Sequence, residues 1–310
     1  MFKRSVVLLL AIVVLISLVA AAFWNPAAKR QARSGGVEKI AIIYVEGVIM
    51  GGRGTGDIFG ESSGTDGIIK QLHKARDDAA VKAVVLRINS PGGSAPASQE
   101  VGTEIKKLRA SGKIVVTSMG DVAASGGYWL AAVTDKIYAN PATMTGSIGV
   151  YIPYANWEEL YKKIGIYQEK IKSGAHKDIL SPERQMTQEE RAIIQGMVDD
   201  LYNQFVAVVA EGRHMDPAKV RQLADGRIYT GSQAKELGLI DEFGTMYDAI
   251  DGAAQLSGIK GKPEIKEYGR TTPWSMLFGA GDEVSLEKLF FRQVRHELPI
   301  TAPLAMPEQW

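Results

Sequence analysis

Short runs of β-branched residues alternate with amphipathic segments from residue 39 onward, and this alternation constrains the fold more than any other feature. The apolar runs predict buried strands, and the segments between them predict helices with one apolar face. This order is typical of an α/β layer architecture in which right-handed crossovers connect parallel strands. We expect strands at 40–45, 83–88, 114–118 and 136–139, and helices at 65–78, 95–110 and 125–132.

An uncharged apolar segment, Ser5 to Trp24, follows Lys3 and Arg4 at the N-terminus. A helix needs about twenty such residues to cross the hydrocarbon core, so we expect a single transmembrane anchor. The basic residues before it favour a cytoplasmic N-terminus, which places the rest of the chain on the outer side of the cell membrane. A secretory signal has the same order of charged and apolar residues, so cleavage after residues 20–22 stays open.

The composition of the 310 residues excludes several classes of function. The net charge is +1, which offers no basic surface for nucleic acid. The absence of cysteine excludes disulfides, thiolate zinc sites and a cysteine nucleophile. The four histidines, at 73, 176, 214 and 296, have no triad or metal-ligand spacing. We therefore expect no metal, no cofactor and no nucleic-acid partner.

Three glycine-rich stretches follow expected strands, at residues 89–94, 123–128 and 145–149. The carboxyl ends of strands gather ligands in an α/β sheet, so we expect the three stretches to meet in one cleft. Ser125 comes at the start of a helix, where free N–H groups can stabilise a developing oxyanion. A helix-capping serine beside closely packed glycines explains the same pattern, and the residues alone leave both interpretations open.

A lysine can replace histidine as a general base, but only where burial lowers the pKa of its amine towards neutrality. Lys177 follows an expected strand and precedes Ser181-Pro182, which is typical of a helix start. Most lysines are solvated, so the residues alone do not select this one.

The chain beyond Lys177 is expected to be mainly helical. Thr187 with Glu190, and Thr230 with Gln233, are spaced as capping boxes, and the helix after Thr187 has an apolar face along residues 193–208. From about residue 261 the periodicity is lost, and we expect a tail with one short helix near 285–296.

Five motifs in order resemble the signal peptide peptidase A family, in its short form with a single copy of the protease domain. They are residues 118–120, 123–128, 145–149, 172–178 and 225–231. The resemblance covers residues 38–255 and implies the ClpP/crotonase-like α/β fold of repeated β-β-α units. The expected parts are a cytoplasmic stub at 1–4, a transmembrane anchor at 5–24, a linker at 25–37, a Ser-Lys protease domain at 38–258 and a C-terminal tail at 259–310.

Carried over residue by residue, the resemblance implies that Ser125 is the nucleophile and Lys177 the general base. Ser147 matches the hydroxyl that holds the base lysine, and the expected oxyanion donors are Gly92 and the N–H of Gly126. In such enzymes the neutral amine takes the serine proton during attack on the peptide carbonyl and returns it to the leaving amine. Activity is then expected to rise towards alkaline pH.

The resemblance also implies substrates and partners. It implies a membrane-anchored endopeptidase that contacts membrane lipid and degrades extended, apolar remnants of signal peptides after preprotein processing. It implies a homo-oligomer, an octameric ring in which Ser125 of one subunit meets Lys177 of its neighbour, so that a single chain keeps the two groups apart. The alternatives are a membrane protease of the same fold that cuts a specific stomatin-like protein, a crotonase-like acyl-CoA enzyme and a non-enzymatic scaffold.

Overall fold

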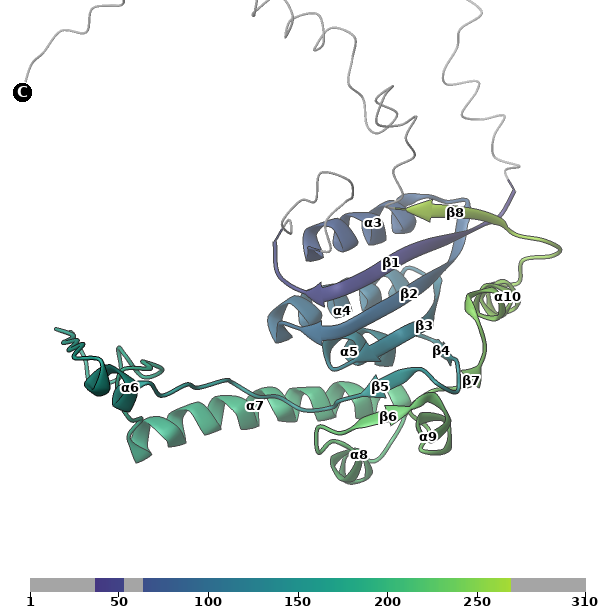
Figure 1. Ribbon diagram of the computed structural model, residues 1–310. Helices are drawn as coiled ribbons and strands as arrows, with labels where there is room; N and C mark the ends of the chain where they lie inside the picture. Colours follow the sequence, from purple (N-terminus) through teal and green to yellow (C-terminus); the bar gives the residue numbers. More distant parts are fainter. Residues whose placement is uncertain (1–36, 53–63, 269–310) are drawn as a thin grey trace, which may run out of the picture.

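The computed structural model describes residues 37–52 and 64–268 (Figure 1). The expected transmembrane segment at 5–24 and the tail helix near 285–296 lie outside the described residues. Within the described ranges, no helix combines the length and the apolar character that a membrane crossing requires.

Strands of the described residues form one eight-stranded sheet. They are β1 (Lys39–Ile49), β2 (Val81–Gly93), β3 (Ile114–Ala124), β4 (Lys136–Ala139), β5 (Met144–Gly146), β6 (Ile228–Thr230), β7 (Glu242–Phe243) and β8 (Glu264–Tyr268). The order is β6-β5-β3-β2-β1-β8, with β4 pairing with β3 and β7. All pairs are parallel except β5 with β6.

Helices cover both faces of this sheet (Figure 1). They are α3 (Thr65–Asp77), α4 (Ala95–Ala110), α5 (Gly126–Ala132), α6 (Glu158–Lys163), α7 (Gln188–Arg213), α8 (Pro217–Leu223), α9 (Gly231–Glu236) and α10 (Met246–Ser257). The helices α3, α4 and α5 and the end of α7 pack into the larger apolar cluster, and α10 packs into a smaller one on the other face. The expected α/β layer architecture is confirmed.

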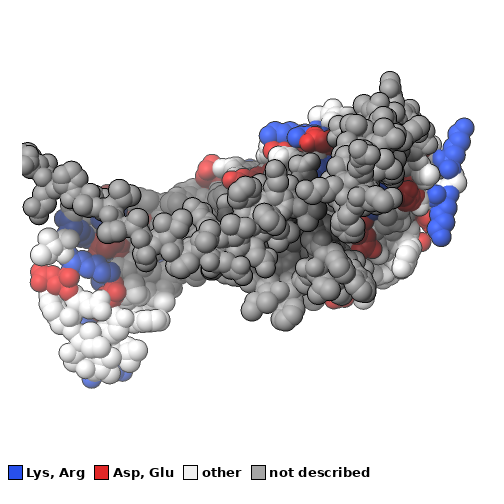
Figure 2. All heavy atoms as spheres, turned by 90° about the horizontal axis from the view of Figure 1, so that it is seen from above, with Lys and Arg blue, Asp and Glu red and all other residues white. Residues whose placement is uncertain are grey.

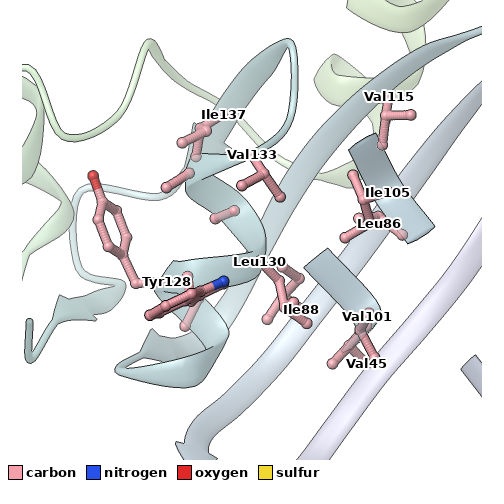
Figure 3. Close-up of a cluster of buried hydrophobic side chains, with 14 of the residues drawn as sticks. Val45, Leu86, Ile88, Val101, Ile105, Val115, Tyr128, Leu130, Val133 and Ile137 are labelled. Carbon is pink, nitrogen blue, oxygen red and sulfur yellow. The ribbon is translucent and has the colours of Figure 1, made fainter. Parts of the chain in front are cut away.

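The apolar run Ala83–Ile88 shows why both faces are covered. All of its side chains except that of Arg87 are buried, which is typical of a parallel strand between two layers of helices. Figure 3 shows Ile88 of β2 beside Leu130 of α5, and Leu86 of β2 beside Ile105 of α4. The same core includes Ala123 and Tyr128, on either side of Ser125 in the chain.

The long strands change register near their carboxyl ends. The β1–β2 ladder shifts between Glu46 and Val48, and the β2–β3 ladder shifts between Ile88 and Ser90. The Asn89 side chain accepts a hydrogen bond from the Val122 N–H at 3.1 Å, where a backbone partner is missing. Such bulges bend strands. The bend in β3 coincides with a change of partner, because its early part pairs with β4 and its last residues pair with β5.

The expected elements agree with this structure near the core and differ from it elsewhere. The four expected strands are present, but β2 and β3 continue into the glycine-rich stretches, because these residues still pair with neighbouring strands. Residues 264–268, which we expected in the tail, form β8 on the edge of the sheet next to β1. No strand lies in residues 165–176, directly before Lys177, and no helix begins at Ser181.

Residues 150–200 extend away from the sheet, and we call this segment the arm (Figure 1). It contains α6, which buries no side chain, and the first half of α7. Seen from above, acidic and basic side chains are intermixed at its outer end (Figure 2). Large apolar side chains are exposed along it, namely Tyr151, Trp157, Leu160, Ile164, Ile166, Tyr167, Ile171, Leu180, Ile193 and Met197. The apolar face expected along α7 is therefore buried only in its second half.

Candidate active site

Ser125 lies between the last residue of β3 and the first residue of α5. Its N–H donates to the Gly146 carbonyl of β5 at 2.8 Å, and its own carbonyl accepts from the Trp129 N–H at 2.9 Å. The backbone of this half-buried serine is thus held by the sheet on one side and by the helix on the other.

The backbone of Ser125 has φ 51° and ψ −120°, a conformation that residues with a Cβ rarely adopt. Its side chain forms no capping hydrogen bond to α5, so the capping interpretation does not account for a serine here. Backbone strain of this kind is typical of functional sites, and a nucleophilic serine on a sharp strand-to-helix turn is one known form.

Gly92 brings the end of β2 against this turn. A Cβ on Gly92 would lie 2.7 Å from the Ser125 Cβ and 2.6 Å from the Gly126 nitrogen, and its φ is +100°. Only glycine permits both this contact and this backbone conformation. Because Gly146 also contacts Ser125, the expectation that the three glycine-rich stretches meet is confirmed.

Three glycine nitrogens near Ser125 are candidate oxyanion donors. Gly126 is the first residue of α5, so its N–H has no partner within the helix. The N–H of Gly92, the other expected oxyanion donor, donates to the Ser90 Oγ at 3.1 Å. The nitrogen of Gly93 lies 3.3 Å from the position that an added Cβ on Gly126 would occupy. In this conformation, Gly93 and Gly126 thus have N–H groups near the nucleophile.

Ser147 lies one residue beyond the β5 carbonyl that binds Ser125. It is half-buried, has φ 50°, and donates its N–H to the Arg227 carbonyl at 2.8 Å. The structure therefore brings together four of the expected site residues: Ser125, Ser147, Gly92 and Gly126.

A hollow of about 270 Å³ opens beside Ser125. Its apolar lining comes from several elements and includes Pro96, Trp129, Ile152, Leu201 and Phe205. The rings of Trp129 and Phe205 are 5.0 Å apart, which gives this hollow an aromatic wall. Such a lining fits an apolar side chain of a ligand.

The sequence analysis did not identify the lining of this hollow. Trp129 lies four residues after Ser125 in one helix, so its spacing was a usable signal. Leu201 and Phe205 belong to the apolar face expected along residues 193–208, to which the sequence analysis gave no role in the site.

Lys177 lies apart from Ser125. It is exposed in the single chain and lines an open hollow formed by residues 170–181, which shares no residue with the hollow beside Ser125. The segment between α6 and α7 belongs to the outer end of the arm (Figure 1). Ser125 lies between β3 and α5 in the rest of the described chain, which we call the body. One chain therefore does not bring the expected nucleophile and base together.

The loop 174–181 around Lys177 consists of turns. Asp178, the next residue, accepts hydrogen bonds from Arg184 Nη2 and Nε at 2.9 and 3.0 Å and from Lys172 Nζ at 2.6 Å. These donors, Arg184 above all, hold the pKa of Asp178 well below its usual range. Arg184 likewise lowers the pKa of Glu190, at the start of α7, to about 2.

The fold and the site together define a class of protein. An α/β sheet presents a serine on a strained turn, with the N–H of Gly126 at the start of a helix and an apolar hollow beside it. This arrangement suits nucleophilic attack on an acyl carbonyl, with the N–H groups stabilising the oxyanion.

Comparison with known proteins narrows this class. The model of peptidase family S49 matches residues 107–260, a range that includes Ser125, Ser147 and Lys177. A Synechocystis protein named as the protease slr0021 is 44% identical over 222 residues, covering 72% of this chain and 76% of the relative. The chain therefore belongs to peptidase family S49, the family of SppA-type serine peptidases.

Other relatives differ in length from this chain. A protein of Enterococcus faecium named as a signal peptide peptidase SppA is 43% identical over 215 residues, covering 69% of this chain. Protease 4 of Haemophilus influenzae is 38% identical over 250 residues, covering 80% of this chain. The matched region spans only 62% of the Enterococcus relative and 38% of the Haemophilus relative.

Proposed function

We propose that this chain is a membrane-anchored serine endopeptidase that degrades remnant signal peptides after preprotein processing, with Ser125 as nucleophile and Lys177 as general base. The observation that carries the proposal is the strained, non-capping Ser125 held against Gly92. The name of the Enterococcus relative supports the substrate class, and the apolar hollow beside Ser125 fits side chains of signal peptides.

The proposed reaction proceeds through an acyl-enzyme. The neutral amine of Lys177 takes the Ser125 proton as Oγ attacks the peptide carbonyl, and returns it to the leaving amine. The N–H of Gly126, with a second glycine N–H from the end of β2, stabilises the oxyanion. The Ser147 hydroxyl holds the lysine, and a water activated by the same amine hydrolyses the acyl-enzyme.

This mechanism requires a second copy of the chain. Because Lys177 is exposed on the arm, we propose that it reaches Ser125 of a neighbouring subunit in a closed ring, an octamer. The exposed apolar side chains of the arm support an interface between subunits. The bent strands, with β3 paired to β4 and then to β5, support a ClpP/crotonase-like fold of repeated β-β-α units.

The location follows from the N-terminal segment. The uncharged residues 5–24 support a single membrane-spanning anchor, and Lys3 and Arg4 support a cytoplasmic N-terminus. The catalytic ring then lies on the outer face of the cell membrane, in contact with lipid and next to the pool of cleaved signal peptides.

The test uses two inactive variants of the full chain in detergent, Ser125→Ala and Lys177→Ala, with Lys162→Ala as a control on the same arm. Each active-site variant is expected to lose at least about a thousandfold in turnover of an apolar fluorogenic peptide, without loss of folding. The control should retain the parent rate.

Co-expression of the two inactive variants tests the shared site. In a random one-to-one ring, about a quarter of the sites pair an intact serine with an intact lysine from the neighbour, so activity should return. Full turnover by Lys177→Ala alone would exclude this lysine as the base, and inactive mixed rings would exclude sharing between subunits.

A further inference from the structure

The carboxylate of Asp178, adjacent to Lys177 in the chain, is fully engaged. Its Oδ1 accepts from Arg184 Nη2 and Lys172 Nζ, and its Oδ2 accepts from Arg184 Nε. Only 10% of the Asp178 side chain is exposed, although the loop around it has no strand or helix. Arg184 is thus the main partner of the residue next to the proposed base.

The other side of the Arg184 guanidinium reaches the start of α7. Its Nη1 donates to Glu190 Oε2 at 2.8 Å, and the Glu190 side chain is only 3% exposed. Glu190 also accepts from the Thr187 N–H at 2.9 Å, and its own N–H donates to the Thr187 Oγ1, which completes a capping box. The loop is therefore tied through one planar side chain to a 26-residue helix whose far end packs in the core.

We propose that Arg184 is a positioning residue for the proposed reaction, which anchors the loop 174–181 to α7 and withholds the Asp178 carboxylate from the amine of Lys177. The inference rests on the proposed role of Lys177 as base.

The anchoring role follows because side chains, chiefly Arg184, link the loop to α7, with only a longer contact from His176 beside it. Backbone bonds inside it are local, such as Lys177 N–H to the Gly174 carbonyl at 3.3 Å and Ser181 N–H to the Asp178 carbonyl at 2.9 Å. None of them connects the loop to the helix. A side chain that must reach a neighbouring subunit loses less entropy on binding when its loop is already ordered.

The withholding role follows from electrostatics. A free carboxylate within about 4–6 Å of an amine favours the charged ammonium form, which cannot accept a proton. Arg184 and Lys172 occupy both oxygens of Asp178 and compensate its charge.

The other charged groups of the loop and its surroundings have partners of their own. Lys170 pairs with Glu183 at 2.6 Å. His176 lies 3.6 Å from Glu189 and 4.0 Å from Glu190. Loss of Arg184 would release the carboxylates of Asp178 and Glu190, but Glu190 keeps the Thr187 N–H, and Asp178 is the one adjacent to Lys177 in the chain.

The first experiment measures pH–rate profiles of the full chain with an apolar fluorogenic peptide. Arg184→Gln is expected to move the alkaline rise of activity upward by about one pH unit, which lowers turnover at neutral pH about tenfold. The double variant Arg184→Gln/Asp178→Asn removes the released charge, so the rise should return to the parent position. Arg184→Lys keeps the charge but not the planar fork that bridges Asp178 and Glu190, so the rise should move by less than in Arg184→Gln.

The matched control is Arg109→Gln. Arg109 donates to Asp135 at 2.6 Å on a distant part of the surface, so its loss removes a similar ion pair without contact to the loop. Its profile should equal that of the parent. A rise that does not move in Arg184→Gln, or that stays displaced in the double variant, overturns the withholding role.

The second experiment measures how well the loop 174–181 is ordered, in a protein that carries out no catalysis. In the Ser125→Ala background, Arg184→Gln should speed amide hydrogen exchange in residues 174–181 at least about tenfold, while Arg109→Gln should not. Unchanged exchange overturns the anchoring role whether or not Lys177 is the base. Full turnover by Lys177→Ala would instead refute the proposed function, and the exchange result would stand by itself.

Discussion

Ser125 and Lys177 are held in place by different kinds of interaction. Ser125 lies at the end of a parallel sheet, over a core of fully buried side chains such as Leu86 and Tyr128. Lys177 lies on an exposed loop of the arm, next to a residue held by charged side chains. The body positions its residue by backbone pairing and apolar packing, and the arm does so by ion pairs.

This difference between the body and the arm indicates which region would control the proposed reaction. Backbone pairing over a packed core is insensitive to salt and to pH, so the turn at Ser125 is ready in each single chain. The arm depends on charged groups and, in our proposal, on a neighbouring subunit. Assembly would then switch on the peptidase by supplying a base to a preformed nucleophile.

The largest expected effect comes from closing the space beside the nucleophile. A methyl group on Gly92 would overlap Ser125 and Gly126, so Gly92→Ala should lower kcat about 10²–10³-fold by displacing the oxyanion donors. Gly112→Ala is the control, since Gly112 also has a positive φ, of +87°, but faces open space. Equal turnover of the two variants in steady-state kinetics would show that the close approach of β2 does not matter for catalysis.

A smaller effect separates the stability of the body from that of the arm. Leu86→Ala in the core should lower the free energy of unfolding by about 2–5 kcal/mol. Ile164→Ala replaces a side chain of the arm that is 57% exposed and should change it by less than about 0.5 kcal/mol. Urea unfolding of both variants in the Ser125→Ala background gives the two values.

The same pair of variants also tests assembly. If the proposed ring forms through the arm, sedimentation should show that Ile164→Ala dissociates at a higher protein concentration than the parent does. A large loss of folding stability from Ile164→Ala, with assembly intact, would mean that the arm is part of the core and would remove the contrast between the two regions.

The smallest expected effect is a loosening of the arm in acid. The folded pKa of Glu190 is lowered to about 2, and that of Asp178 is also lowered, because both carboxylates bind Arg184. Their contribution to stability is therefore complete above about pH 4.5, and it is lost as the pH falls towards 2. The protection factors of amides in residues 174–190, which correct for the intrinsic pH dependence of exchange, should fall between pH 4 and pH 2, before those in β2 do. Simultaneous loss of protection in both regions would contradict an arm held by ion pairs.

Local patterns of the sequence were sufficient to predict much of the body. The apolar run 83–88 predicts a strand that is buried on both faces, and the capping boxes at Thr187 and Thr230 are present as expected. Each of these features is decided by residues within a few positions of one another. The meeting of the glycine-rich stretches also followed from the general geometry of α/β sheets.

Only the tertiary structure decided the features that depend on distant residues. The pairing of β8 with β1 joins segments that are far apart in the chain, and no local pattern marked residues 264–268 as a strand. The strained backbone of Ser125 and the hollow lined by Trp129 and Phe205 arise where separate elements meet. The separation of Lys177 from Ser125 was also decided by the tertiary structure, because it depends on the course of the chain through the arm. Hydrogen bonds within one turn of chain are encoded locally, whereas contacts between elements form only once the sheet has assembled around its core.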